Sequence, residues 1–291
     1  MNKIKETVII SGKGGTGKTS VTASLIPFMK DTVFADCDVD APNLSILLEP
    51  ERKKEELFYG MKRAVFNQDL CSSCGQCLEY CRFGAIRDDF SVITPSCEGC
   101  AVCVHVCPTG AMTMKDVPVG SLFESETPYG TMVHARLIPG EETSGRLVSQ
   151  VRKNAMTVAE ETGKSRILID GPPGIGCSVI SSVTGADSVC IVTEPTLSGL
   201  HDLKRVYTMI LRFNPEVFII INKSDLSEKV CSDIEAFAAE NDIPVTLKIP
   251  FRKEIIEALS DKQIPSLAEK EFFRDLGWED LIKKLNPSEI Q

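Results

Sequence analysis

Residues 12–19, GKGGTGKT, are the stretch that decides the fold. They follow an apolar run, TVIIS at 7–11, and precede an expected helix at 20–29. The spacing fits the template G-x4-G-K-[ST], in which glycines let backbone N–H groups curl around phosphate oxygens at a helix N-terminus. In this template Lys18 reaches the β- and γ-phosphates of a nucleotide, and the hydroxyl of Thr19 binds Mg²⁺. The sequence therefore predicts a nucleotide-binding phosphate loop rather than an ordinary glycine turn.

Apolar runs alternate with helical patterns along the rest of the chain. Near-continuous runs, bounded by Gly, Pro, Asp or Asn, lie at 32–35, 166–170, 188–193, 217–222 and 245–249. Such runs suit strands of a parallel sheet that is covered on both faces. We therefore expect an α/β fold with a doubly wound, mostly parallel sheet of the P-loop NTPase type.

Eight of the twelve cysteines interrupt this rhythm. They form a repeat, CSSCGQCLEYC at 71–81 and CEGCAVCVHVC at 97–107. The chain shows no sign of export, so thiols are expected to stay reduced and metal or cluster ligation is favoured over disulfides. We expect an inserted α+β domain at 67–116 between two parts of the P-loop domain at 1–66 and 117–291. Residues 117–145 would be the return segment, with a possible hairpin near 132–137.

The spacing C-x2-C-x2-C-x3-C, present twice, is that of bacterial two-cluster ferredoxins. In those proteins the last cysteine of each run ligates the other [4Fe–4S] cluster. Pro108 after the second run fits the pattern, and Arg82 after the first departs from it. Two tetrahedral zinc sites are the alternative, although zinc would more naturally use two C-x2-C pairs per site. The expected ligands are Cys71, Cys74, Cys77 and Cys107 for cluster one, and Cys81, Cys97, Cys100 and Cys103 for cluster two.

Lys13, at the start of the phosphate loop, makes the chain resemble the deviant Walker-A ATPases, the superfamily of MinD, ParA, Mrp and the nitrogenase iron protein. The resemblance covers nearly everything outside the insert. It implies that Lys13 crosses a dimer interface to the partner's nucleotide, so that hydrolysis requires dimerisation.

Further motifs carry the resemblance in order along the chain. DCDVDAPN at 36–43 resembles the first switch, and DGPPG at 170–174 resembles the Walker-B aspartate that leads into the second switch. Aspartates after strands are common as helix caps, and only their order after the phosphate loop favours a catalytic role. Asp38 would orient the attacking water, whereas Asp40 is the weaker candidate.

The resemblance also implies ligand sets. Mg²⁺ would be held by Thr19, Asp36 and Asp170, and catalysis would use Lys13, Lys18 and Asp38. Asn222 would read adenine, and the loop at 249–251 would close over the base. The ATP-binding residues would be Gly12, Lys13, Gly14, Gly15, Thr16, Gly17, Lys18, Thr19, Ser20, Asn222, Pro250 and Phe251.

The remaining cysteines carry less information. Cys190 lies in an apolar run and is expected in the core, Cys37 is expected to be structural, and Cys231 carries no signal. Cys177, seven residues after Asp170, resembles a cluster-ligating cysteine of the nitrogenase iron protein. With no matching second cysteine, a cluster bridging two subunits is the less favoured reading.

Composition limits the partners. Thirty-two basic against forty-one acidic residues give a net charge of −9, which disfavours nucleic acid. No apolar run approaches the roughly 20 residues that span a bilayer, and no signal peptide is evident, so a cytoplasmic location is expected. The amphipathic stretch at 272–285 mixes acidic and basic residues, so we expect it to dock on its own domain, without stable membrane binding.

Three functional hypotheses follow. The first is an ATPase that couples nucleotide-driven dimer switching to electron transfer, with ATP, Mg²⁺ and two [4Fe–4S] clusters as cofactors. The second is an iron–sulfur cluster carrier of the Mrp type, and the third is a regulator like MinD or ParA with redox-sensing clusters. The expected partners are an identical subunit or a paralogous ATPase, together with a redox or iron–sulfur protein.

Overall fold

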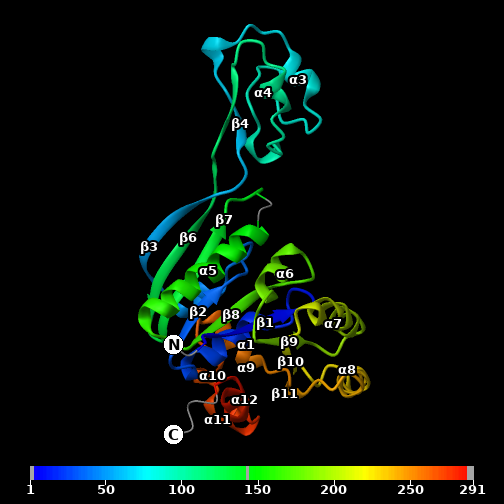
Figure 1. Ribbon diagram of the computed structural model, residues 1–291. Coiled ribbons are helices and arrows are strands. Elements are labelled where there is room, and N and C mark those ends of the chain that lie inside the picture. Colours follow the sequence, from blue (N-terminus) through cyan, green and yellow to red (C-terminus); the bar gives the residue numbers. More distant parts are fainter. Residues whose placement is uncertain (1–2, 142–143, 287–291) are drawn as a thin grey trace. The chain divides into compact units, whose positions relative to one another are not determined.

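The computed structural model describes residues 3–141 and 144–286 and divides the chain into two compact units. The first, called the sheet unit, comprises Met1–Glu55, Leu122–Arg136 and Ser144–Gln291. The second, called the cysteine unit, comprises Glu56–Ser121 and Leu137–Thr143 and contains the whole segment 67–116. The chain leaves the sheet unit through β3 (Glu51–Tyr59) and returns to it through β6 (Pro118–Thr127) (Figure 1).

A large sheet organises the sheet unit. Its strand order is β11-β10-β9-β1-β8-β2-β7-β6-β3. The strands not yet introduced are β1 (Lys5–Ser11), β2 (Thr32–Asp36), β7 (Gly130–Leu137), β8 (Arg166–Pro173), β9 (Ser188–Thr193), β10 (Glu216–Asn222) and β11 (Val245–Ile249). The strands from β11 to β7 pair in parallel, with β1 between β8 and β9. The mostly parallel sheet predicted from the apolar runs is confirmed.

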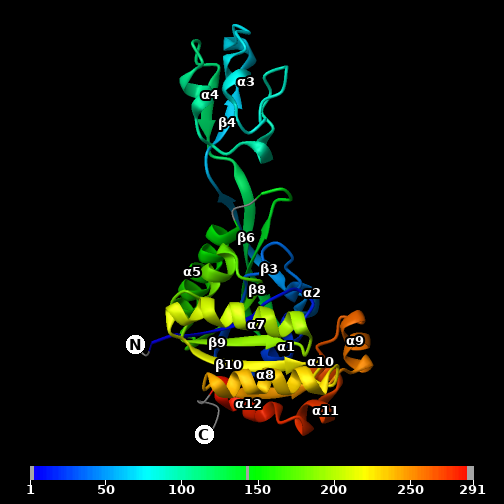
Figure 2. The same ribbon diagram turned by 90° about the vertical axis from the view of Figure 1, so that its right-hand side faces the viewer.

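Helices cover both faces of this sheet. One layer holds α5 (Ser144–Thr162), α6 (Cys177–Val183), α7 (Leu197–Ile210) and α8 (Glu228–Glu240), and Figure 2 shows α7 and α8 running along β9 and β10. The other holds α1 (Lys18–Leu25), α2 (Leu44–Leu48), α9 (Lys253–Ser260), α10 (Pro265–Ala268), α11 (Lys270–Asp275) and α12 (Trp278–Leu285). Ile9 packs into the core on the α1 side, whereas its fully buried neighbours Val8 and Ile10 point to the opposite face. Both faces of β1 are therefore covered, as in a doubly wound fold.

The C-terminal amphipathic stretch packs on its own sheet. Phe273, Trp278, Leu281 and Leu285 are buried in the same core as β1 and β10. Its apolar face is therefore used within the chain, as the sequence predicts. Among the residues described, no helix combines the length and apolar character needed to cross a membrane.

The cysteine unit repeats one short motif. A two-stranded antiparallel sheet of β4 (Arg63–Phe66) and β5 (Met112–Lys115) joins its beginning to its end. Two short helices, α3 (Gln76–Tyr80) and α4 (Val102–His105), each contain the third cysteine of one run. Each helix follows a left-handed residue, Gly75 or Ala101. The repeat in the sequence is therefore also a repeat in the backbone.

Candidate functional site

The phosphate loop lies where β1 ends and α1 begins, and its shape depends on glycine. Gly15 and Gly17 have φ of 82° and 92°, a region that side chains rarely adopt. A Cβ on Gly17 would also lie 2.2 Å from Nδ2 of Asn222. Glycine at position 17 therefore satisfies both the backbone conformation and the close approach of β10.

Asp170 gathers the side chains at the start of α1. Its Oδ2 lies 2.9 Å from Nζ of Lys18 and accepts a hydrogen bond from the Thr19 hydroxyl at 2.8 Å. Its Oδ1 accepts from the Thr22 hydroxyl at 2.7 Å. Burial lowers the pKa of Lys18, but Asp170, Asp36 and Asp38 outweigh this effect, so that the pKa is raised and the ammonium stays charged. The structure thus brings together Lys18, Thr19 and Asp170 as one charged cluster.

Asp36 shapes the segment that follows β2. It is fully buried beside Asp170, its neighbour in strand register, and burial together with that carboxylate raises its pKa well above the ordinary value. Its two oxygens accept hydrogen bonds from the backbone amides of Asp38 at 3.0 Å and Leu44 at 3.3 Å. These two bonds hold the third residue of the expected first switch and the residue that directly follows it.

Asp38 lies close to the same lysine. Its carboxylate is 3.7 Å from Nζ of Lys18, and burial raises its pKa while Lys18 opposes the rise. The structure therefore places Asp38, the residue expected to orient the attacking water, beside the lysine of the phosphate loop.

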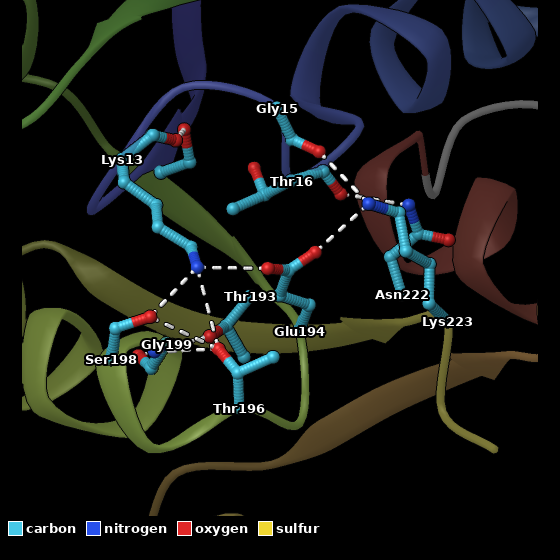
Figure 3. A network of polar contacts seen from close by, with 11 residues as sticks. Lys13, Gly15, Thr16, Thr193, Glu194, Thr196, Ser198, Gly199, Asn222 and Lys223 are labelled. Carbon is cyan, nitrogen blue, oxygen red and sulfur yellow. Dashed lines mark hydrogen bonds and ion pairs between the residues drawn. The ribbon is translucent and has the colours of Figure 1, made fainter. Parts of the chain in front are cut away.

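Lys13 is held by the sheet unit itself. Its Nζ lies 2.8 Å from Oε1 of Glu194 and donates hydrogen bonds to the hydroxyls of Ser198 at 2.9 Å and Thr196 at 3.3 Å (Figure 3). The other carboxylate oxygen of Glu194 lies 2.9 Å from Nζ of Lys223. Burial raises the pKa of Glu194, but the hydrogen bonds and charges of the two lysines outweigh this effect, so that the pKa is lowered. The carboxylate is therefore ionised between the two lysines.

This network was not anticipated from the sequence. Lys223 also donates to the carbonyl of Gly15 at 3.0 Å, and so ties β10 to the phosphate loop (Figure 3). Glu194 directly follows β9 and Lys223 directly follows β10. Both residues therefore lie at the carboxyl ends of the parallel strands, where β1 leads into the phosphate loop. Charged residues directly after β9, which pairs with β1, and after β10, which pairs with β9, were the signal that could have revealed them.

A cavity of about 280 Å³ adjoins the loop. Its lining includes Ser20, Asn222, Pro250 and Phe251, together with apolar side chains such as Ile255. Nδ2 of Asn222 donates to the carbonyl of Thr16 at 2.7 Å (Figure 3). The structure therefore brings the residues expected for base binding next to those expected for phosphate binding.

The eight clustered cysteines divide between two cavities of the cysteine unit. One cavity is lined by Cys71, Cys74, Cys77 and Cys107, with Phe66 and Phe90 among its apolar walls. The other is lined by Cys81, Cys97, Cys100 and Cys103, with Phe83 and Val92. Each cavity thus brings together the four cysteines expected to hold one cluster. Among residues 3–141 and 144–286, no three His, Cys, Asp or Glu side chains are grouped as for a single metal ion.

Backbone amides point at several of these sulfurs. The amide of Ala64 donates to Sγ of Cys97 at 3.4 Å, and that of Ser73 donates to Sγ of Cys71 at 3.3 Å. Burial raises the pKa of Cys107, but hydrogen bonds from Met112, Thr109 and Ala111 prevail and lower it to about 7. Burial raises the pKa of Cys77 and Cys103. The features that favour the thiolate, the metal-binding form, are therefore the hydrogen bonds to Cys71, Cys97 and Cys107.

The scattered cysteines lie apart from these cavities. Cys190 and Cys37 are fully buried, as expected for core residues, and Cys231 is also buried. Cys177 is exposed at the first residue of α6. His105 is exposed at the end of α4.

Comparison with known proteins defines the class. Residues 7–265 match the family model described as the CobQ/CobB/MinD/ParA nucleotide binding domain. The chain belongs to this family of P-loop nucleotide-binding proteins, and the resemblance to MinD and ParA seen in the sequence is confirmed.

Individual proteins are also similar to this chain. The uncharacterized protein MJ0578 of Methanocaldococcus jannaschii is 36% identical over 228 residues, which cover 77% of this chain and 80% of the relative. An iron–sulfur cluster carrier protein of the same organism is 25% identical over 284 residues, covering 91% and 79%. The septum site-determining protein MinD of Pyrococcus horikoshii OT3, solved with Mg-ADP, superimposes with a TM-score of 0.57 at 18% identity, covering 97% of this chain and 96% of that one. That likeness shows the fold.

The close approach at Gly17 predicts the effect of adding one methyl group. We expect Gly17→Ala to weaken MgADP binding by about tenfold or more, because the Cβ strains the loop and displaces Asn222. Gly163→Ala is the matched control, since Gly163 also has a positive φ of 67° but open space around it. Isothermal titration calorimetry measures both affinities. Unchanged affinity in Gly17→Ala would show that the loop tolerates a side chain there.

Proposed function

We propose that this chain is an ATP-hydrolysing iron–sulfur protein in which nucleotide-driven dimer switching controls electron transfer. The observation that carries the proposal is the division of eight cysteines into two cavities of four, in the same chain as a P-loop site. The two sites are built from separate parts of the chain, the phosphate loop for the nucleotide and the eight cysteines for the proposed clusters.

The nucleotide chemistry rests on side chains that already contact one another. Lys18 and the Thr19 hydroxyl, both bound to Asp170, are the groups that the loop template assigns to the β/γ-phosphates and to Mg²⁺. Asp38, near Lys18, would position the attacking water. Phosphoryl transfer asks a protein mainly for positioning and charge neutralisation, which these residues supply.

Lys13 would act on the nucleotide of a partner subunit, either a second copy or a paralogue. In this chain it is bound to Glu194 and two hydroxyls. Reaching a partner's phosphate would require Lys13 to leave these partners, so we propose that dimerisation and release from Glu194 occur together. Glu194 keeps Lys223 as a partner after such a change.

The cysteine unit would hold two [4Fe–4S] clusters, whose chemistry is one-electron transfer. Cys71, Cys74, Cys77 and Cys107 would hold one, and Cys81, Cys97, Cys100 and Cys103 the other. Backbone amides directed at the sulfurs stabilise negative charge, which is one means by which a protein adjusts a cluster's reduction potential.

The covalent path between the two functions is short. The proposed first switch at 36–43 is followed directly by α2, and only two residues separate α2 from β3, which enters the cysteine unit. We propose that nucleotide-dependent movement of this switch is transmitted along this path.

A second candidate function is delivery of iron–sulfur clusters. It is favoured by the 25% identity to an iron–sulfur cluster carrier protein over 91% of the chain, and by the exposure of Cys177. Four cysteines around each cavity favour retention of a cluster over its release, and for this reason electron transfer is the leading proposal.

The cluster assignment predicts a definite metal content. Anaerobically prepared protein should contain about eight iron and about eight sulfide per chain, because each of the two proposed cubane clusters would contribute four of each. Cys74→Ser and Cys100→Ser should each lose about half of both, since each removes one ligand from a different set. Iron and acid-labile sulfide analysis measures this.

Two further variants make the result specific. Cys231→Ser, outside both cavities, should retain the full content. A loss of iron in Cys177→Ser would instead support a bridging cluster and the carrier function. Zinc in place of iron and sulfide would contradict the proposal.

The proposed dimer predicts complementation. Lys13→Gln should lower the ATP hydrolysis rate by about a hundredfold or more, because one positive charge is removed from the transition state in the partner's site. Mixing Lys13→Gln with Lys18→Gln should partly restore activity, since one mixed site then has an intact Lys18 and receives Lys13 from the other chain. Lys153→Gln, an exposed change on α5, is the control. Absence of restoration in mixtures that form dimers would show that Lys13 acts within its own subunit.

A further inference from the structure

A second large cavity of the sheet unit, with a volume of about 440 Å³, has no part in the nucleotide site. It lies between the segment that carries α2 into β3 and the strands β3, β6 and β7. Its lining includes Ser45, Glu49, Arg52, Phe123, His134 and Arg136. The volume is in the range of small-molecule sites in proteins.

Stacked rings and guanidinium groups form one wall. The guanidinium of Arg52 lies over the ring of Phe123, 4.5 Å from its centroid. Phe123 in turn stacks on His134, with centroids 5.0 Å apart and an interplanar angle of 28°. A guanidinium that lies over a ring keeps its N–H edge available for a carboxylate or phosphate. Arg136, two residues after His134 on β7, projects from the same face of the strand.

The cavity carries positive charge. Two guanidiniums and one carboxylate, that of Glu49, belong to its lining. Burial lowers the pKa of His134 to about 4, and the positive charges of Arg52 and Arg136 contribute to this shift. Both guanidiniums are therefore close enough to His134 to affect its charge. His134 is therefore neutral at physiological pH, and the lining keeps one net positive charge.

The imidazole of His134 has a polar partner of its own. Nε2 of His134 lies 3.0 Å from the hydroxyl of Ser125, and both residues are buried. This pairing satisfies one nitrogen of the imidazole and fixes the ring that supports Phe123. The base of the cavity is thus ordered, while the exposed guanidiniums at its rim remain available.

We infer that this cavity binds a small anionic molecule through a carboxylate or phosphate group held by Arg52 and Arg136. This site is additional to the proposed function and does not depend on it. Glu49, in the same lining, would bind a cationic or hydroxyl group of the same ligand.

The cavity also adjoins the proposed first switch. Pro42 and Ser45 belong to its lining, and the segment between them is held by the bond from the Leu44 amide to Asp36. A ligand here contacts the same backbone that Asp36 orders beside the nucleotide site.

The test is calorimetric titration of the full chain with inorganic phosphate and, separately, succinate. Saturating MgADP is present throughout, so that the phosphate loop is occupied. We expect at least one probe to bind at one saturable site per chain. Arg52→Gln and Arg136→Gln should each weaken this binding by about tenfold or more, because each removes a charge-assisted hydrogen-bond donor.

Controls separate a specific site from general attraction. Arg212→Gln, an exposed arginine outside the cavity, should bind the probe like the wild type. Arg52→Lys keeps the charge but loses the planar fork and should bind more weakly than the wild type. Retained MgADP binding shows that each variant is folded. Binding of phosphate alone identifies a phosphate ligand, and binding of succinate alone identifies a carboxylate.

Two results would overturn the inference. One is the absence of saturable binding of either probe by the wild type. The other is equal binding by the wild type and the Arg52→Gln, Arg136→Gln double variant.

Discussion

The ion pair between Lys18 and Asp170 is the interaction on which the nucleotide site depends. Lys18 is 5% exposed, and an ammonium so deeply buried requires a carboxylate at contact distance. Asp170 meets this need because β8 pairs with β1 in parallel and ends at the same edge of the sheet. The hydroxyls of Thr19 and Thr22 then orient Asp170, so α1 is tied to β8 through this carboxylate.

The cysteine unit has only a small hydrophobic core. Its two small hydrophobic clusters include the cysteines themselves, among them Cys77 in one and Cys97 in the other. A core this small supplies little hydrophobic stabilisation, and small domains of this kind are usually stabilised by ligation or cross-linking. Binding of the proposed clusters and folding of the cysteine unit are therefore expected to be linked, as they are in small metal-binding domains. The sheet unit, with continuous cores on both faces of its sheet, has no such need.

The central strands and the phosphate loop were predictable from sequence, because a strand buried on both faces leaves a continuous apolar run. The boundaries of β9 and β11 match the predicted runs, and β1 begins only two residues earlier. The edge strand β3 was not predicted, since its sequence ERKKEELFY is almost entirely exposed and has no apolar alternation. The Lys13–Glu194–Lys223 network and the Arg52–Arg136 cavity were also missed, because strands far apart in the sequence bring these charges together.

The central claim is that nucleotide in the sheet unit controls electron transfer from the cysteine unit. Its most direct test is the rate at which the anaerobically reduced protein passes electrons to a soluble dye, followed by stopped-flow absorbance with no nucleotide, with MgADP and with a non-hydrolysable MgATP analogue. The account predicts that the analogue changes this rate by about fivefold or more, and that Lys13→Gln, with its clusters intact, shows no such change. Identical rates under all three conditions, in protein that binds nucleotide and holds its full iron content, would contradict it.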